Sequence, residues 1–195
     1  SCVLSKKYYE ENAQTFFDST LSVDMKPLYE RLLPLMPPGA SILDAGCGSG
    51  RDAAFFKHEG FDVTAIDASE TLCKLASAFL GQDVHCLRFD EIVWEGAFDA
   101  VWACASLLHV PRKELPDAFE RLFRALKPDG VLYCSFKYGT GEREQGGRHF
   151  TDLDEHGLET VISETGAAVE VETWLTEDQR PDRDEHWLNA LVRLK

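Results

Sequence analysis

A glycine-rich turn is the part of the sequence best suited to holding a small ligand. Residues 44–50 read Asp-Ala-Gly-Cys-Gly-Ser-Gly and lie between an apolar segment and a segment of helical character. Glycines allow a sharp turn and a close approach of the backbone to a ligand. A helix that begins after such a turn presents free N–H groups and the positive end of its dipole to an anionic group. The turn therefore predicts a ligand site.

Two carboxylates indicate which kind of ligand this turn would accept. Asp67 ends the next apolar segment, 19 residues after Gly48, close to the offset at which an acid contacts a cofactor ribose. Asp44 begins the turn, where its negative charge would repel a pyrophosphate. It suits a ligand that carries an ammonium group and a sulfonium centre.

The glycine spacing by itself leaves a dinucleotide cofactor open. The dinucleotide fingerprint needs Gly or Ala at the fifth position after its first glycine. Counted from Gly46 that position is Arg51, which does not fit, but counted from Gly48 it is Ala53, which does. The acid at position 44, rather than the glycine register, argues against a nicotinamide-dependent oxidoreductase.

Alternating strands and helices are expected to position the turn. From about residue 41 onward, short apolar segments alternate with helical periodicity, which predicts a mostly parallel sheet covered by helices on both faces. We expect strands at residues 41–46, 61–67, 84–90, 97–106 and 131–138, and a closing hairpin of residues 167–175 and 186–194. We expect helices at residues 5–19, 25–36, 51–58, 69–81, 115–126 and 151–165, and a mobile glycine-rich loop at 139–149.

Two of these helices have specific signals. Ser69 is the expected N-cap of helix 69–81, whose expected buried stripe consists of Leu72, Leu75, Ala76 and Phe79. Thr151 and Asp154 are spaced like a capping box at the start of helix 151–165.

The composition limits the compartment and the partners. The chain has 195 residues and a net charge of -14, which fits one globular domain and argues against binding a phosphate backbone. No apolar segment approaches the ~20 residues of a membrane span, and the N-terminal residues contain no apolar leader. The six cysteines form no C-x-x-C pair, so we expect reduced thiols in the cytoplasm, no bound metal, and a monomer or homodimer without membrane or nucleic-acid partners.

The order of the motifs resembles the class I S-adenosylmethionine (SAM) dependent methyltransferases. The matching pieces are ILDAGCGSG (42–50), TAIDAS (64–69), RFD (88–90), FDAVWACASLLHV (98–110) and ALKPDGVLYCSFK (125–137). Within that family the chain looks most like the small stand-alone enzymes of types 11 and 12 and the tellurite-resistance-like methyltransferases. The resemblance implies a Rossmann-like α/β three-layer sandwich with a mostly parallel seven-stranded sheet and a C-terminal antiparallel hairpin, formed by residues 1–195 as a single domain.

The resemblance also implies which residues contact the cofactor. The amino acid end of SAM would be held by Asp44, Gly46, Cys47, Gly48 and Gly50. The ribose hydroxyls would be bound by Asp67, and the adenine would be flanked by Ala68, Ser69, Phe89 and Asp90. Below the sulfonium methyl the resemblance places Cys104, Ala105 and Ser106. Residues 1–38 would form a helical lid with the aromatic residues Tyr8, Tyr9 and Phe16.

The implied activity is methyl transfer from SAM, which becomes S-adenosylhomocysteine, to a small-molecule or oxyanion acceptor. An RNA or protein methyltransferase and a non-catalytic SAM-binding regulator remain as alternatives. Family members that methylate amino groups carry Asn/Asp-Pro-Pro-Tyr/Phe after the fourth strand, where this chain has Ala103, Cys104, Ala105 and Ser106. This departure argues against methylation of DNA bases and leaves the acceptor open.

Several polar residues have both a chemical and a structural interpretation. His109 is the candidate general base, or else it stabilises the turn before Pro111. Cys104 is a candidate nucleophile, although a small buried thiol is the more common case. An anionic acceptor would be bound by cations after the fifth strand and near the C-terminus, or these side chains are solvated or paired: Lys137, Arg143, Arg148, His149, Arg180 and Arg183.

Overall fold

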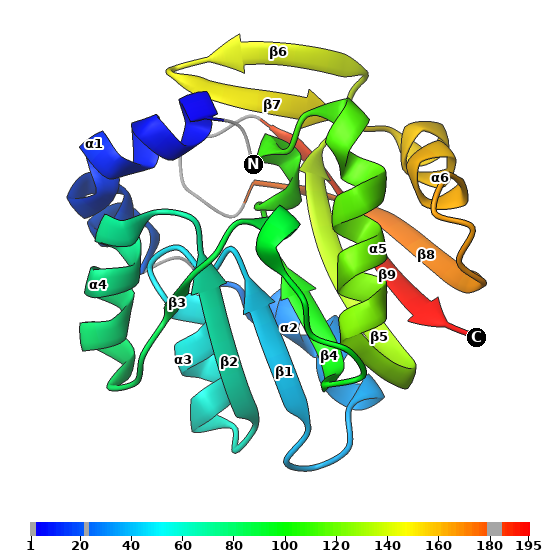
Figure 1. Cartoon of the computed structure of the whole chain (residues 1–195), viewed down its shortest axis with the longest axis horizontal. Helices are drawn as coiled ribbons and strands as arrows, with labels where there is room; N and C mark the ends of the chain where they lie inside the picture. Colours follow the sequence, from blue (N-terminus) through cyan, green and yellow to red (C-terminus); the bar gives the residue numbers. More distant parts are fainter. Residues whose placement is uncertain (1–2, 22–23, 179–184) are drawn as a thin grey trace.

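A central sheet with helices on both faces forms the body of the protein in the computed structural model, which describes residues 3–21, 24–178 and 185–195. The strands of this sheet are β1 (Ser41–Ala45), β2 (Asp62–Asp67), β3 (His85–Cys86), β4 (Phe98–Ala103), β5 (Leu126–Lys137), β8 (Val169–Glu177) and β9 (His186–Leu194). Their order is β3-β2-β1-β4-β5-β9-β8 (Figure 1). Strands β1 to β5 pair in parallel, whereas β9 pairs antiparallel with both β5 and β8. The predicted α/β fold with its C-terminal antiparallel hairpin is confirmed.

Helices cover both faces of this sheet. They are α1 (Val3–Thr20), α2 (Lys26–Leu32), α3 (Arg51–His58), α4 (Glu70–Leu80), α5 (Leu115–Ala125) and α6 (Glu155–Ser163). The 3-10 helices are η1 (Leu33–Leu35), η2 (Phe89–Glu91), η3 (Leu107–His109) and η4 (Arg112–Glu114).

The two faces of the sheet bury two separate apolar clusters. Consecutive side chains of β1 alternate, so Ile42 packs with residues of α2, α3 and α4, and Leu43 packs with residues of α5 and α6. Phe56 of α3 and Phe119 of α5 are fully buried in these respective layers. Burial on both faces explains why the central strands are apolar almost throughout.

The carboxyl ends of the parallel strands are covered by two further elements. An antiparallel hairpin of β6 (Gly141–Gln145) and β7 (Arg148–Asp152) lies above this edge, and α1 lies beside it and against α4 (Figure 1). The hydroxyl of Ser5 in α1 accepts a hydrogen bond from the backbone N–H of His149 at 2.8 Å. The N-terminal helix is thus attached both to the hairpin and to the body of the domain.

The hairpin corrects the prediction of a mobile loop at residues 139–149. Gly146 and Gly147 both have positive φ, +59° and +78°, and connect two strands that pair from Gln145 and Arg148 to Gly141 and Asp152. A two-residue turn with two positive φ angles matches the twist of an antiparallel pair. The Gly-Gly dipeptide therefore indicates a hairpin turn. The polar, glycine-rich composition of residues 139–149 had instead suggested a mobile loop.

The predicted capping box at Thr151 is also wrong. Thr151 lies in β7, and its hydroxyl donates to the carbonyl of Val110 at 2.7 Å. The helix starts only at Glu155, where Asp154 is the N-cap and accepts from the N–H of Gly157 at 2.8 Å. The competing tertiary hydrogen bond of Thr151 explains the later start.

Two other expectations need correction. The third strand contains only His85 and Cys86, because the chain turns into η2 before residue 90. In α4 the N-cap Ser69 is confirmed, but Phe79 is 46% exposed and contacts Phe17 of α1 edge-on, with 5.9 Å between ring centroids. The buried face of α4 consists of Leu72, Cys73, Ala76 and Leu80.

The helices and the cysteines bear on the expected membrane and redox properties of the chain. None of the helices in the described ranges is both long and apolar enough to cross a bilayer. The cysteines at positions 47, 73, 86, 104 and 134 are free thiols, as expected, and Cys2 lies outside the described residues.

Candidate functional site

The glycine turn after β1 is locked against the loop after β4. Gly46 has φ +83°, and a Cβ on it would lie 2.4 Å from the Cβ of Ser106. The hydroxyl of Ser106 donates to the carbonyl of Ala45 at 2.7 Å. The N–H groups of Gly46 and Cys47 both donate to the carbonyl of Ile66 at 2.9 Å. Glycine is required at position 46 because two loops cross there without space for a side chain.

Asp67 holds the turn from the end of β2. Its Oδ2 accepts from the N–H of Gly48 at 2.9 Å, and its Oδ1 accepts from the N–H of Ser69 at 3.0 Å. Burial raises the pKa of this carboxyl, and the two N–H donors oppose that effect. Each carboxylate oxygen can accept a further hydrogen bond, so the fixed side chain remains able to bind a hydroxyl group.

Asp44 is a buried acid with an unused acceptor. It is 2% exposed, and its Oδ2 has no hydrogen-bond partner in the described residues. Burial raises its pKa well above the usual range, the charge of Asp52 adds to this effect, and Arg51 opposes it. A buried polar atom without a partner requires an explanation, and a cationic ligand group would supply one.

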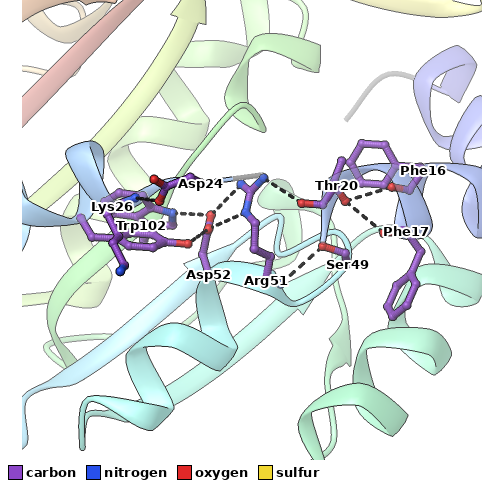
Figure 2. A network of polar contacts seen from close by, with 10 residues as sticks. Phe16, Phe17, Thr20, Asp24, Lys26, Ser49, Arg51, Asp52 and Trp102 are labelled. Atoms are coloured by element: carbon purple, nitrogen blue, oxygen red, sulfur yellow. Dashed lines mark hydrogen bonds and ion pairs between the residues drawn. The ribbon is translucent and has the colours of Figure 1, made fainter. Parts of the chain in front are cut away.

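The partly buried Arg51 and the buried Asp52 form an ion pair at the start of α3 (Figure 2). Arg51 Nε and Nη2 lie 2.8 Å and 3.2 Å from the two oxygens of Asp52. The indole of Trp102 donates to Asp52 Oδ2 at 2.8 Å, and the hydroxyl of Tyr29 donates to Oδ1. Burial alone would raise the pKa of Asp52, but Arg51 and these donors lower it. Asp52 therefore stays ionised.

Two cavities adjoin at the carboxyl edge of the sheet. The Asp67 cavity is lined by polar and apolar side chains that include Asp67, Ser69, Leu72, Leu87 and Phe89. The Lys137 cavity is lined by residues that include Arg51, Cys104, Lys137, Arg148 and Asn189. Both cavities share Tyr9, Phe16, Gly46, Gly48, Ala105 and His109. The shared residues form the boundary between the two spaces.

His109 stands in that boundary with both ring nitrogens hydrogen-bonded. Its Nε2 lies 2.9 Å from the hydroxyl of Tyr9, and its Nδ1 lies 2.8 Å from the carbonyl of His149. Burial lowers the pKa of His109 to about 4, and the charges of Arg148 and Lys137 add to this effect, although the His149 carbonyl opposes it. The imidazole is therefore neutral at pH 7.

Known proteins with similar sequences are methyltransferases. The model of a family described as "Methyltransferase domain" matches residues 42–130. These residues include Asp44, Asp67 and the loop after β4. The chain is 34% identical over 118 residues to the putative methyltransferase YqeM of Bacillus subtilis, an alignment that covers 52% of this chain and 46% of that protein. It is 37% identical over 106 residues to a malonyl-[acyl-carrier protein] O-methyltransferase of Pectobacterium atrosepticum, covering 53% and 42%. Residues 42–130 are thus similar in sequence to the methyltransferase domain family. It spans less than half the length of these two relatives.

Solved structures of this fold extend the similarity to nearly the whole chain. A Burkholderia thailandensis 1,6-didemethyltoxoflavin-N1-methyltransferase, determined with S-adenosylhomocysteine, has a TM-score of 0.77 at 23% identity and covers 97% of this chain and 84% of its own. A TehB-like SAM-dependent methyltransferase from Corynebacterium glutamicum has a TM-score of 0.70 at 19% identity and covers 97% and 98%. At these identities the likeness establishes the methyltransferase fold.

The structure brings together most of the residues that the sequence singled out as cofactor contacts. The Asp67 cavity is lined by Tyr9, Gly46, Gly48, Asp67, Ala68, Ser69, Phe89, Ala105, Ser106 and His109. Cys47 and Cys104 line the Lys137 cavity. Cys104 is half-buried, and desolvation raises the pKa of its thiol to about 12, which disfavours a nucleophilic thiolate.

Three of the predicted cofactor residues do not line either cavity. Asp44 is buried, and its unpartnered oxygen is enclosed within the described residues. Gly50 packs towards Ala76 and Leu80 of α4. Asp90 is exposed and pairs with Arg88 at 3.0 Å.

Sequence reasoning missed the side chains that reach the site from elsewhere in the chain. The Asp52 network, in which Arg51, Tyr29 and Trp102 donate hydrogen bonds to Asp52, was not predicted. The sequence around an acid in a helix does not indicate which distant side chains will contact it. Ser135 was also missed; its hydroxyl accepts from the N–H of Ala105 at 2.7 Å and fixes the loop after β4. Of the cations considered for an anionic acceptor, Lys137 and Arg148 line a cavity, whereas Arg180 and Arg183 lie outside the described residues.

Proposed function

We propose that this chain binds SAM in the Asp67 cavity and transfers its methyl group to a small-molecule or oxyanion acceptor in the Lys137 cavity. The observation that carries the proposal is the fixed carboxylate of Asp67 beside the glycine turn, in a domain that matches methyltransferases. Relatives named malonyl-[acyl-carrier protein] O-methyltransferase and 1,6-didemethyltoxoflavin-N1-methyltransferase support the activity.

The residues of the site fit SAM in charge and in shape. The orphaned oxygen of Asp44 suits the cationic end of the ligand, and the turn at Gly46 and Gly48 allows its backbone to approach closely. The Asp67 carboxylate suits two ribose hydroxyls. The apolar side chains of Leu72 and Phe89 suit an adenine ring. When bound, SAM supplies an electrophilic methyl group on a sulfonium.

Each part of the site then has a role in positioning. Asp67 orients the ribose, Asp44 and the glycine turn hold the amino acid end, and Ala68, Ser69 and Phe89 enclose the base. Ala105 lines both cavities, Cys104 lines the Lys137 cavity and Ser106 lines the Asp67 cavity, so this loop would line the path to the acceptor. In-line methyl transfer depends mainly on such positioning and on exclusion of water.

The N-terminal helix is proposed as a cover of the site. Tyr9 and Phe16 of α1 line both cavities, and Ser5 ties the helix to the hairpin. We propose that residues 1–38 act as this lid within a single domain. The role of His109 as a general base stays a prediction, because Tyr9 or His149 would first have to release a ring nitrogen.

Calorimetric titration with SAM, S-adenosylhomocysteine and NAD tests the proposal. We expect micromolar binding of the two adenosyl compounds and none of NAD. Asp67→Ala should weaken SAM binding by about 1–3 kcal/mol, the scale of a lost hydrogen bond to a charged group. Asp90→Ala, which removes an exposed acid, is the control and should bind SAM like the wild type. Binding of SAM without methyl transfer to any acceptor in a labelled screen would indicate a regulator instead.

A further inference from the structure

Arg148 is a partly buried cation that has no ion-pair partner among the residues that the structure describes. It begins β7 and lines the Lys137 cavity but not the Asp67 cavity. Its Nε is buried without a hydrogen-bond partner, and it forms no ion pair with any residue in the described ranges. Two neighbouring cations differ, because Lys137 pairs with Glu185 at 2.9 Å and Arg143 pairs with Asp152 at 2.6 Å.

Aromatic rings hold Arg148 in place without neutralising it. Its Cζ lies 4.8 Å from the ring centre of Tyr8 and 5.0 Å from that of Phe150. Lys137 Nζ and Arg143 Cζ approach the same Phe150 ring at 4.3 Å and 4.7 Å. Cation–π contacts offset part of the cost of removing a guanidinium from water, but they leave its charge intact. Of the three cations around Phe150, Arg148 is therefore the one without an acidic partner in the described ranges.

Neighbouring groups respond to this positive charge. Burial lowers the pKa of Lys137, and Arg148 and Arg143 lower it further although Glu185 opposes them. The lining of the same cavity also includes Glu177 and Asp178, and Asp178 accepts a hydrogen bond from the indole of Trp187 at 3.2 Å. A partly buried charge without an ion-pair partner destabilises the folded protein, and an anionic ligand beside Arg148 would offset this cost.

We propose that Arg148, assisted by Lys137, binds an anionic group of the methyl acceptor, either a carboxylate or an oxyanion, in the Lys137 cavity. The planar donors of a guanidinium match both groups and bind them through paired hydrogen bonds. This inference rests on the proposed function, because it assigns the Lys137 cavity to the acceptor and the Asp67 cavity to SAM.

Titration of the ¹⁵N-labelled protein saturated with S-adenosylhomocysteine tests this assignment. The probes are acetate, benzoate, sulfate and phosphate at constant ionic strength, with benzamide as the neutral match of benzoate. The Nε–H resonance of Arg148 reports whether an anion arrives there. We expect it to shift with at least one of these anions and not with benzamide. A preference for benzoate would indicate an organic acid as acceptor, and a preference for sulfate or phosphate an inorganic oxyanion.

Variants separate the anion site from the cofactor site. Arg148→Gln should weaken the preferred anion at least about tenfold, because a charge-assisted pair is lost. Arg124→Gln changes an exposed arginine of α5 and should leave the affinity unchanged within about twofold. The Kd of S-adenosylhomocysteine should be the same in all three proteins.

Three results would overturn the inference: no anion binding more tightly than benzamide, a preference that survives Arg148→Gln, or a loss of S-adenosylhomocysteine affinity in that variant. The last result would assign Arg148 to the cofactor. If the wild type did not bind S-adenosylhomocysteine at all, the proposed function would fail by itself. The anion titration of the free protein would then still decide the role of Arg148.

Discussion

Tyr9 and His109 are joined by a hydrogen bond of 2.9 Å between the phenol oxygen and Nε2. The other ring nitrogen of His109, Nδ1, faces the carbonyl of His149 at 2.8 Å. Because a carbonyl can only accept, Nδ1 carries the proton and Nε2 accepts from Tyr9. Helix α1, η3 and β7, which are far apart in the sequence, thus meet at one neutral imidazole.

This arrangement predicts that His109 makes folding depend on pH. Its pKa is about 4 in the folded protein and near the ordinary value of about 6.5 when unfolded. The unfolded chain therefore binds a proton between these values while the folded one does not, and stability is lost as the pH falls through this window. Between pH 7.5 and pH 5 the wild type should lose about 2 kcal/mol more than His109→Gln in urea unfolding.

Glutamine is the matched replacement because it keeps one donor and one acceptor but does not titrate. Histidines elsewhere in the chain are present in both proteins, so their contributions cancel. Equal pH dependence of the two proteins would mean that the imidazole is accessible to protons in the folded state. It would also support His109 as the general base.

Substitution of Gly46 is predicted to destabilise the crossing of the two loops. A Cβ at position 46 would lie 2.4 Å from Ser106 Cβ, and φ is +83°. We expect Gly46→Ala to lower the free energy of unfolding by about 2–5 kcal/mol, from left-handed backbone strain and overpacking together. Gly60→Ala is the control, since φ is +94° but no atom lies within 4 Å of the added Cβ, so only the backbone strain remains.

A second substitution separates the clash at Gly46 from its backbone strain. In the double variant Gly46→Ala, Ser106→Gly, the clashing Cβ is absent, although the bond from Ser106 to Ala45 is lost as well. The loss for Gly46→Ala should be smaller in the Ser106→Gly background than in the wild type. Additive losses would show that steric contact between the two loops is not the cause.

The Asp52 network predicts a large effect from a change of one atom. Asp52→Asn leaves the partly buried Arg51 without its counter-charge and should cost about 3–5 kcal/mol of unfolding free energy. Asp117→Asn breaks the exposed pair of Asp117 with Arg121 at 2.9 Å and should cost at most about 1 kcal/mol. Denaturant unfolding of both variants makes the comparison. Similar small losses would indicate that water solvates Arg51 in the folded protein.

The sequence predicted those parts of the fold that depend on local signals. The strand, glycine turn and helix at residues 41–58 and the N-cap Ser69 appear where expected, since apolar runs, glycines and cap residues act over a few positions. The start of α6 was misplaced because the hydroxyl of Thr151 bonds to Val110, 41 residues away. Such a partner leaves no trace in the neighbouring sequence.

The site was predictable to the same extent. Gly46, Gly48 and Asp67 lie in one motif with fixed spacing, so their convergence followed from the order of the elements. Arg148 was one of several candidate cations, and only the structure distinguishes it from Arg143, which pairs with Asp152. Which charges are neutralised depends on tertiary contacts, and the sequence alone does not encode these in a readable pattern.

We predict that the buried carboxylate of Asp44 lowers the free energy of unfolding and strengthens the binding of SAM. Its pKa is raised, first by burial and then by Asp52, so the folded protein is penalised once the pH exceeds the ordinary carboxyl range. Asp44→Asn keeps the shape and should raise the free energy of unfolding at pH 8 by about 1 kcal/mol, with a smaller gain at pH 5. The same variant should bind SAM at least about tenfold more weakly, because the cationic end of SAM loses its counter-charge. Asp90→Asn, at an exposed acid, should change neither quantity. A less stable Asp44→Asn protein would show that the carboxylate is already compensated without a ligand.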